Sequence, residues 1–368
     1  MESKSKVAVL HYVWIDNIHV NSLVSAVSKS GLRVKKSKAR ISKVGLIILL
    51  SPIYPLIHRV AGYRILHIHW MLGVFRPPSP SGRYADKFFY LWYKLFMSVT
   101  RLVNLKVVWT AHNFMPMGHV FEDNLAARKH LVQHCSAVIA LSESVATRLT
   151  NELGAKNVVI IPAAEPTLVP TESRITTREN LHIGENQKLF SAIGHMKPYK
   201  GPDIFLQSIL LQDSNNRFLL SGAIDDSEFV SQVIELTETV KARGHSLETN
   251  FSFLPDSELA NLLQASDFLV CPFRDISNSG FINLALAAGT PLILPDWESL
   301  AWVPREAALW YPADGGAQAL ASAIQYAGSL NSTECELMSQ AARDFMKTRG
   351  WDNYVLQHSL LYEALMSN

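Results

Sequence analysis

Short apolar runs alternate with helix-like segments along most of the chain, and this alternation restricts the fold more than any other feature. In the first half the runs read KVAVLHY, YRILHIHW, KVVWTAHN, SAVIALS and NVVIIPA, and in the second half KLFSAIG, RFLLSGA, NFSFL, DFLVCPF and PLILP. They are too continuously apolar for strands that expose one face to water. Because helical segments separate them, they predict parallel sheets covered on both faces, which is the α/β fold class.

The length and composition allow two such units. A chain of 368 residues with 48% hydrophobic content can bury two cores. The segment PAAEPTLVPTESRITTRENLHIGENQ is rich in Pro, Thr, Glu and Asn without periodicity, which indicates an interdomain linker near residues 170–185. We therefore predict a first domain over 1–170, a second over 186–345, and a closing helix over 346–368 that can pack back on the first domain.

Charge is unevenly distributed, although the net charge is only +2. Residues 33–107 carry 14 Lys or Arg against one acid, Asp86, a local charge of +13 that leaves about −11 for the rest. Such a block indicates a polyanionic neighbour. The apolar stretch 44–57 follows basic residues, and residues 87–103 place Phe, Tyr and Trp beside Lys and Arg. This combination favours an anionic membrane surface. The alternative is two core-facing helices with solvated basic backs; without a nucleic-acid-binding motif we expect no nucleic acid partner.

Several absences bear on location and metal binding. No apolar run reaches the roughly 18 residues that cross a bilayer, and MESKSKVAVL lacks signal-peptide architecture, so we expect a cytoplasmic protein, peripheral on the inner face of the membrane. The three cysteines match no zinc or redox spacing, which fits a reducing compartment. His67 and His69 alternate in a strand, and we interpret them as core or cleft-lining histidines. We expect no metal site.

The stretch GHMKPYKGPD, residues 194–203, lies between the apolar run KLFSAI and the amphipathic run IFLQSILLQ. In open α/β sheets, ligands bind outside the carboxyl ends of the strands. Gly194 and Gly201 permit a close backbone approach, and Lys197 and Lys200 bring positive charge to the turn. This arrangement suits a diphosphate, whereas the alternative is a loop with ordinary solvated lysines.

A second strand end carries a polar loop. CPFRDISNSGFINLALAAGTPLILP passes through a turn from Asp275 to Gly280 and enters an apolar helix near residue 281. Ser277, Asn278 and Ser279 offer hydroxyl and amide groups, and the first N–H groups of the helix attract an anion. Simple N-capping would need one such residue. The absence of GxxxxGK[ST] and GxGxxG sequences argues against a kinase, an ATPase or a dinucleotide dehydrogenase.

These stretches resemble a known family. The sequences YKG, SGAI, LPDSELANLLQASDFLVCPF, SNSG and ALAAGTPLILP follow the order and spacing of the nucleotide-sugar domain of two-domain GT-B glycosyltransferases. In the first half, LHIHW, VVWTAHNFMP and SAVIALSES resemble bacterial enzymes of exopolysaccharide synthesis, including xanthan-type mannosyltransferases. The resemblance implies two Rossmann-like parallel-sheet domains facing each other across a cleft. It also implies metal-independent hexosyl transfer from GDP-mannose or a UDP-sugar to a lipid-linked saccharide, with the nucleotide sugar as co-substrate and no cofactor.

The resemblance also implies roles for matching residues. Lys197 and Lys200 would neutralise the donor diphosphate, whose negative charge grows as it leaves. Ser277, Asn278, Ser279 and Gly280 would form the anion loop, with Gly194 beside the donor. His112 matches a histidine that faces the donor sugar. Glu306 is a further candidate for the donor ribose.

The sequence departs from the family at two places. Many retaining relatives carry a Glu-x7-Glu pair where this chain has Ile276 and Leu284, so that Asp275 and Asn283 are the adjacent polar substitutes. Relatives also tend to have Pro-His-Glu where this chain reads Pro116, Met117, Gly118, His119. An inverting transfer would need a base, for which His112, His119 and Asp16 are the candidates, whereas a retaining transfer can use the donor phosphate.

The sequence therefore indicates a glycosyltransferase whose first domain binds the acceptor and faces the membrane. Two alternatives remain open. One is a catalytically silent relative that binds a nucleotide or glycan as a partner subunit, which the missing Glu pair favours and the retained lysines disfavour. The other is a nucleotide-sugar epimerase, which calls for a cluster of carboxylates that the histidine-bearing strand regions lack.

Overall fold

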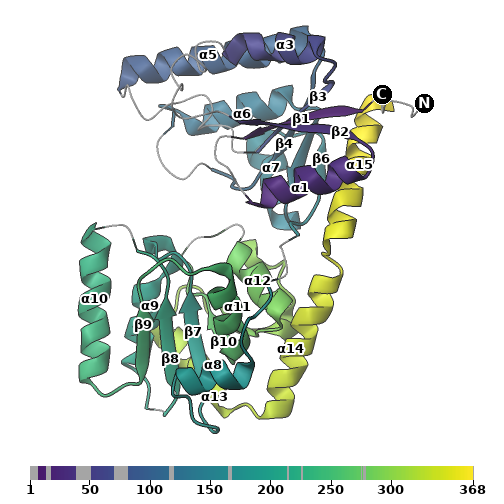
Figure 1. Cartoon of the computed structure of the whole chain (residues 1–368). Coiled ribbons are helices and arrows are strands. Elements are labelled where there is room, and N and C mark those ends of the chain that lie inside the picture. Colours follow the sequence, from purple (N-terminus) through teal and green to yellow (C-terminus); the bar gives the residue numbers. More distant parts are fainter. Residues whose placement is uncertain are drawn as a thin grey trace. The chain divides into compact units, whose positions relative to one another are not determined.

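The computed structural model divides the chain into two compact units (Figure 1). It describes residues 7–13, 18–38, 51–69, 82–115, 120–164, 168–213, 215–224, 227–274, 276 and 279–367. Unit 1 comprises residues 1–163 together with 351–368, and unit 2 comprises residues 164–350. The C-terminal helix thus belongs to unit 1, although unit 2 precedes it in the chain.

Unit 1 is built on a six-stranded parallel sheet in the order β2-β1-β3-β4-β5-β6. Its strands are β1 (Ala8–Val13), β2 (Arg33–Lys38), β3 (Ile65–Ile68), β4 (Lys106–Thr110), β5 (Ala137–Ala140) and β6 (Val158–Ile160). Its helices are α1 (Ile18–Lys29), η2 (Ser51–Ile53), α3 (Tyr54–Val60), α5 (Arg83–Leu102), α6 (Asn124–His134), α7 (Glu143–Leu153) and α15 (Trp351–Ser367).

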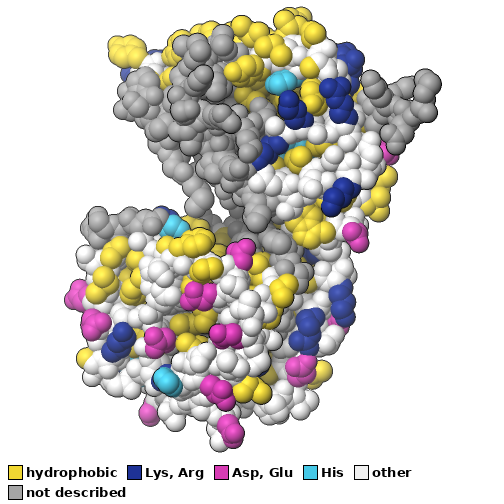
Figure 2. All heavy atoms as spheres, in the orientation of Figure 1, with side chains coloured by type: hydrophobic (Ala, Val, Ile, Leu, Met, Phe, Trp, Pro, Cys, Tyr) yellow, Lys and Arg dark blue, Asp and Glu magenta, His cyan; other side chains and the backbone are white. Residues whose placement is uncertain are grey.

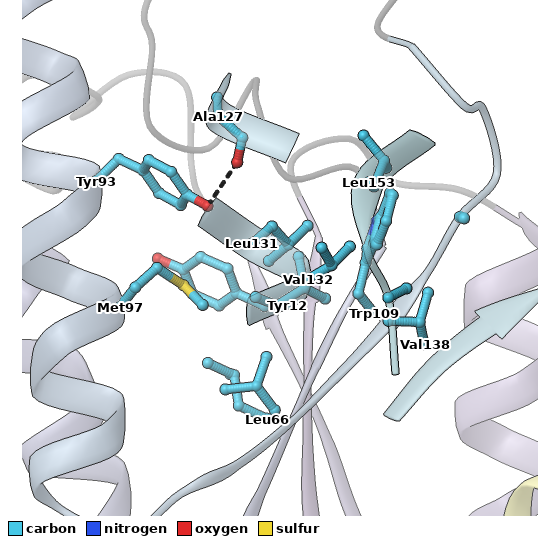
Figure 3. Close-up of a cluster of buried hydrophobic side chains, with 14 of the residues drawn as sticks. Tyr12, Leu66, Tyr93, Met97, Trp109, Ala127, Leu131, Val132, Val138 and Leu153 are labelled. Carbon is cyan, nitrogen blue, oxygen red and sulfur yellow. Dashed lines mark hydrogen bonds between the residues drawn. The ribbon is translucent and has the colours of Figure 1, made fainter. Parts of the chain in front are cut away.

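The two faces of the unit 1 sheet differ in chemistry. One face is an apolar core that includes Tyr12, Leu66 and Trp109 of the sheet together with Tyr93 and Met97 of α5 (Figure 3). Because successive side chains of a strand point to opposite faces, the neighbouring positions in β1, β3 and β4 direct His11, His67 and Thr110 to the other face. These three side chains are fully buried. The sheet therefore has a polar interior on the side opposite its main apolar core.

Unit 2 is a second six-stranded parallel sheet, in the order β12-β11-β10-β7-β8-β9. Its strands are β7 (Leu189–Ile193), β8 (Arg217–Ser221), β9 (Leu247–Asn250), β10 (Phe268–Val270), β11 (Leu292–Pro295) and β12 (Ala308–Tyr311). Its helices are α8 (Arg174–Asn180), η3 (Pro198–Lys200), α9 (Pro202–Ile209), α10 (Ser227–Ala242), α11 (Asp256–Ala265), α12 (Gly280–Ala288), η4 (Glu298–Leu300), η5 (Arg305–Ala307), α13 (Gly316–Ser329) and α14 (Ser332–Lys347). Separate apolar clusters cover its two faces, one with α11 and α12 and the other with α9, α10 and α13. The predicted parallel α/β sheets are confirmed.

The segment that we interpreted as a linker contains a helix. Helix α8 packs on α11, and its Arg178 donates to the Asp267 carboxylate at 2.8 Å. Arg174 donates to the other oxygen of the same carboxylate, and the backbone N–H of Leu189 also donates to Asp267. The non-periodic sequence did not reveal this helix because charge pairs to the body of unit 2, rather than an apolar stripe, hold it.

Candidate functional site

Two glycines allow the loop after β7 to pack closely against Pro272 and Phe281. At Gly201 φ is +67°, and a Cβ there would collide with the carbonyl oxygen of Pro272. At Gly194 φ is +115°, and a Cβ would lie 2.7 Å from Cζ of Phe281. Both glycines are thus required by contacts within the protein, which bring the loop onto the end of β10 and the start of α12. This packing explains the two glycines without a ligand.

The lysines of this loop lie at the carboxyl edge of the unit 2 sheet, as predicted. Lys197 precedes η3 and Lys200 ends it. The Nζ atom of half-buried Lys200 lies 4.7 Å from the centroid of the Phe281 ring. Burial lowers the pKa of Lys200, and the charge of Lys197 acts in the same direction, while Cys271 opposes it. A desolvated ammonium group beside a second cation favours an anion at this edge.

The loop after β10 is described in part. Ser279 is the N-cap of α12 and accepts a hydrogen bond from the N–H of Ile282 at 3.4 Å, while Gly280 begins the helix and is exposed. The side chain of Ser279 therefore performs the ordinary capping role. The other members of the predicted loop, Asp275, Ser277 and Asn278, lie outside the described residues.

Two buried polar side chains near the same edge have unsatisfied atoms. Asn283, in the first turns of α12, is 1% exposed, and neither atom of its amide has a hydrogen-bond partner in the described part of the chain. The hydroxyl of Ser221, at the carboxyl end of β8, is likewise buried and unpartnered among the described residues. Unsatisfied groups of this kind are rare in native proteins and often mark the place of a ligand. Sequence reasoning selected Asn283 and missed Ser221, although SGAI matched the family.

The positions of the family's Glu pair are apolar in structure as well as in sequence. Ile276 is 9% exposed within the apolar cluster of α11 and α12, and Leu284 packs against that cluster. Neither position is built for a carboxylate. Polar contacts to a donor at this edge must therefore come from other residues.

Glu306 must be removed from the predicted donor site. It lies in η5, which directly precedes β12, and its side chain is exposed. Because β12 runs parallel to β11, Glu306 lies at the amino edge of the sheet, opposite the edge that carries the lysines. The four residues of β12 span about 13 Å, which is the distance between the two edges of the sheet at this strand. The sequence prediction was wrong because it did not fix where β12 begins.

The amino edge of unit 2 also carries a hollow of about 720 Å³, lined by charged residues. Its four cationic side chains already have partners within the protein. Arg174 and Arg178 pair with Asp267, the Lys188 ammonium donates to the carbonyl of Ala327 at 2.7 Å, and Arg343 pairs with Glu336. The hollow is therefore a weaker candidate than the carboxyl edge.

In unit 1, His112 follows β4 and lies at the carboxyl edge of that sheet. Its Nε2 atom is 3.1 Å from Nδ1 of His69. The other proposed bases, Asp16 and His119, lie outside the described residues. His67 and His69 are buried, in agreement with the interpretation as core histidines, and their ring centroids are 4.2 Å apart. Burial lowers the pKa of both well below the ordinary range.

Sequence reasoning missed two partners of these histidines. His11 of β1 lies 2.9 Å from His69, and Tyr362 of α15 lies 2.6 Å from His67. The alternation in KVAVLHY could have placed His11 on the same face as His67. Nothing in the sequence could have placed Tyr362 there, because 295 positions separate it from His67.

Comparisons with known proteins agree with this geometry. The family model described as "Glycosyl transferases group 1" matches residues 187–327, which carry the lysine loop and α12. The sucrose-phosphate synthase from Thermosynechococcus elongatus superposes with a TM-score of 0.77 at 17% identity, over 98% of this chain and 99% of the other. The chain thus has the two-domain GT-B fold, and its second unit resembles group 1 glycosyltransferases. HepE from Anabaena, in complex with UDP and glucose, superposes with a TM-score of 0.72 at 13% identity, over 98% of this chain and all of that one.

The sequence of the present protein also resembles curated glycosyltransferases. The present protein is 26% identical over 247 residues to the GDP-mannose:glycolipid 4-beta-D-mannosyltransferase of Xanthomonas campestris pv. campestris, covering 66% of this chain and 64% of the relative. It is also 26% identical over 223 residues to the D-inositol 3-phosphate glycosyltransferase of Corynebacterium glutamicum, covering 57% and 52%. The chain thus matches slightly less than two thirds of the length of the Xanthomonas relative.

Proposed function

We propose that this protein transfers a hexose from a nucleoside diphosphate sugar to a lipid-linked saccharide, without a metal ion or cofactor. GDP-mannose is the first donor to test, because the Xanthomonas relative is named for it, and UDP-sugars are the second, because HepE was solved with UDP. Unit 2 binds the donor and unit 1 binds the acceptor.

One observation carries the donor assignment: a desolvated Lys200 beside Lys197 and unsatisfied polar atoms occur at the same edge of unit 2. Lys200 and Lys197 supply positive charge to a leaving diphosphate, which metal-independent transfer requires. Asn283 and Ser221 supply neutral polar groups for the uncharged parts of the donor. Asp275, Ser277 and Asn278 remain proposed members of the anion loop, with Ser279 and Gly280 at the start of the helix.

The acceptor assignment rests on an exposed apolar stripe on α5. Its buried side includes Phe89, Tyr93, Phe96 and Met97, yet on the outside Tyr84, Phe88, Leu91, Leu95 and Leu102 are between 43% and 91% exposed. Helix α3 contacts α5 and exposes Leu56, Ile57 and Val60 as well. In Figure 2 hydrophobic side chains are frequent along the edge of unit 1 where these helices lie. This exposed apolar surface supports a membrane contact over two helices with merely solvated backs.

Basic residues accompany the stripe. Lys87, Lys94 and Arg101 recur every seven positions of α5, and Arg83 stands at its start. No helix in the described residues is long and apolar enough to cross a bilayer. A surface with apolar side chains beside lysines and arginines fits the interface of an anionic bilayer. We propose that unit 1 binds the inner face of the membrane here, which would bring it to a lipid-linked acceptor.

The donor proposal is tested by titrating UDP, GDP, ADP, TDP and their sugars into the protein and into Lys200→Met. Methionine keeps the contact with Phe281 but removes the charge. Since a charge-assisted hydrogen bond contributes about 1.5–3 kcal/mol, we expect roughly ten- to hundredfold weaker binding of one nucleotide class. Lys241→Met, an exposed lysine of α10, is the control and should bind normally. Equal binding by both variants would contradict the diphosphate role.

Turnover separates the alternatives. Transfer from the bound nucleotide sugar to a polyprenyl-diphosphate saccharide supports the proposal. Donor binding without turnover on any lipid acceptor would instead indicate a silent relative. Conversion of the donor with no acceptor requirement would indicate an epimerase.

The membrane proposal is tested by cosedimentation with vesicles of phosphatidylglycerol and phosphatidylcholine. The variant Lys87→Glu with Lys94→Glu should lose binding, because it reverses two charges beside the stripe. The variant Lys29→Glu with Lys156→Glu makes the same change in net charge on other elements and should bind as the unmodified protein does. Equal losses in the two variants would show that only net charge matters.

A further inference from the structure

A continuous hydrogen-bonded chain runs through the polar interior of unit 1 and ends at His112. The hydroxyl of Thr110 lies 2.7 Å from Nε2 of His67, and Nδ1 of His67 lies 2.6 Å from the hydroxyl of Tyr362. That hydroxyl lies 3.4 Å from Nε2 of His11.

The chain continues from His11. Its Nδ1 lies 2.9 Å from Nε2 of His69, and Nδ1 of His69 lies 3.1 Å from Nε2 of His112. The members come from β1, from β3 and the residue after it, from β4 and the loop after it, and from the C-terminal helix α15. Thus a residue near the end of the sequence is linked to a side chain at the carboxyl edge of the unit 1 sheet.

The protons of such a chain must all point the same way. A neutral imidazole has one N–H donor and one acceptor nitrogen, and a hydroxyl donates one hydrogen bond. The interior histidines are neutral, because burial lowers the pKa of His11 to about 3 and those of His67 and His69 well below the ordinary range. If the Tyr362 hydroxyl donates to one of its two histidine neighbours, reversal of one bond therefore forces reversal of every other bond in this hydrogen-bonded chain.

Thr110 decides the direction. If its hydroxyl donates to His67, each later donor finds an acceptor, from His67 to Tyr362, His11, His69 and finally Nε2 of His112. If the direction is reversed, the Thr110 hydroxyl receives a hydrogen bond, and its own proton has no acceptor among the described residues. Thr110 is fully buried, so that an unmatched donor there would be costly. The first direction is favoured.

A metal ion is the competing explanation for the same side chains. One ligand atom from each of His11, His67 and His69 lies within 4.8 Å of the others, which is close enough to surround an ion. However, both ring nitrogens of each of these histidines already have a hydrogen-bond partner. A metal would have to displace these bonds, and the family resemblance gives no reason for one.

We propose that this hydrogen-bonded chain holds His112 as the neutral tautomer with its proton on Nδ1. Tyr362 of the C-terminal helix is then a positioning residue for His112. His69 donates to Nε2 of His112, so the ring proton of His112 lies on Nδ1. This proposal rests on the proposed function only in the identity of the molecule that binds beside His112.

This assignment changes the choice of base. A histidine that donates through Nδ1 and accepts from His69 through Nε2 has no nitrogen left to remove a proton from an acceptor hydroxyl. Through Nδ1, His112 can then act only as a hydrogen-bond donor. The role of base falls to His119, Asp16 or the donor phosphate.

The test is nitrogen NMR of the protein labelled with ¹⁵N in its histidine rings, because protonated and unprotonated ring nitrogens have well separated shifts. The signals of His112 are identified by their loss in His112→Gln. We expect a protonated Nδ1 and an unprotonated Nε2. A proton on Nε2 instead would overturn the proposal, and so would a stoichiometric metal found by elemental analysis of the protein as purified.

Two variants test whether the far end of the chain matters. Tyr362→Phe cuts the chain between His67 and His11, and Thr110→Val removes the donor that sets its direction. In each, His112 should change from one tautomer to a mixture of both, although neither substitution touches it. Tyr93→Phe is the matched control: its hydroxyl is also buried in unit 1 and donates to the carbonyl of Ala127 at 3.2 Å (Figure 3), outside the chain.

The outcomes are separable from those of the transferase assays. Unchanged His112 signals in Tyr362→Phe and Thr110→Val, or an equal change in Tyr93→Phe, would overturn the proposal. If Tyr362→Phe does not fold, Thr110→Val and the unmodified protein still decide it. A protein with a fixed His112 tautomer and no transferase activity would contradict the proposed function but leave this inference intact.

Discussion

Unit 1 should lose stability on mild acidification because its interior histidines are buried in the neutral form. The pKa of His11 is lowered from 6.5 to about 3, and those of His67 and His69 fall in the same direction. Since these folded-state values are depressed, the stabilisation is complete above the unfolded value of 6.5 and is lost as the pH falls towards the folded values. At about pH 5.5, one unit below the unfolded value, each histidine costs between about 1 and 2 kcal/mol relative to about pH 7.5.

Three histidines together amount to about 4 kcal/mol, a large part of the 5–15 kcal/mol that is typical of a native protein. His130 of α6, whose pKa is lowered to about 4, acts in the same direction. Every buried histidine among the described residues lies in unit 1, so that unit 2 provides an internal control.

Hydrogen exchange followed by mass spectrometry measures both units in one sample. After correction for the intrinsic pH dependence of exchange, peptides from β1, β3 and β4 should lose protection at about pH 5.5 by roughly three powers of ten. Peptides from β7 and β8 should change much less. Equal protection of the unit 1 strands at the two pH values would refute the burial of neutral histidines in this sheet.

Three further predictions concern unit 2. Gly201→Ala should destabilise unit 2 by about 2–5 kcal/mol, because it combines left-handed backbone strain with a collision against Pro272. Gly244→Ala has a similar φ but open space around the new Cβ, and should cost about 1 kcal/mol. Thermal unfolding of both variants measures the difference, and equal losses would contradict the packing at Gly201. Cys271, whose pKa burial raises to about 12, should react with iodoacetamide more slowly than half-buried Cys335, as peptide mass spectrometry would show; rapid labelling of Cys271 would contradict its burial. Asn283→Leu should stabilise the ligand-free protein by about 1–3 kcal/mol and weaken nucleotide-sugar binding; a loss of stability would show that its amide is satisfied.

Local patterns were sufficient to predict most of the fold. Runs such as KLFSAI and KVVWT became β7 and β4, because strands covered on both faces need continuous apolar sequence. The lysine loop followed directly, since a loop after a parallel strand must lie at the carboxyl edge. Helix α8 was missed because it is held by ion pairs to Asp267, which no periodicity records.

The site was predictable only where its residues lie close to a strand end. Lys197, Lys200, His112 and Asn283 satisfy this condition. Glu306 was misplaced because sequence alone did not show that it precedes β12. The link from Tyr362 to His11 spans 351 positions, and only the packing of α15 on unit 1 creates it.

The two units handle polar groups in opposite ways, and this contrast bears on the missing Glu pair. At the carboxyl edge of unit 2, cations of the lysine loop lie near a neutral, unsatisfied Asn283, whereas Ile276 and Leu284 keep the family's acidic positions apolar. In unit 1 a chain of neutral imidazoles leads to His112. A leaving diphosphate needs positive charge, and uncharged hydroxyls need neutral donors and acceptors. The amide of Asn283 can supply both kinds of neutral contact without the desolvation cost of a carboxylate. Under the proposed function, Asn283 would therefore make neutral contacts to the donor where relatives make charged ones, and the lysine loop would still supply the positive charge.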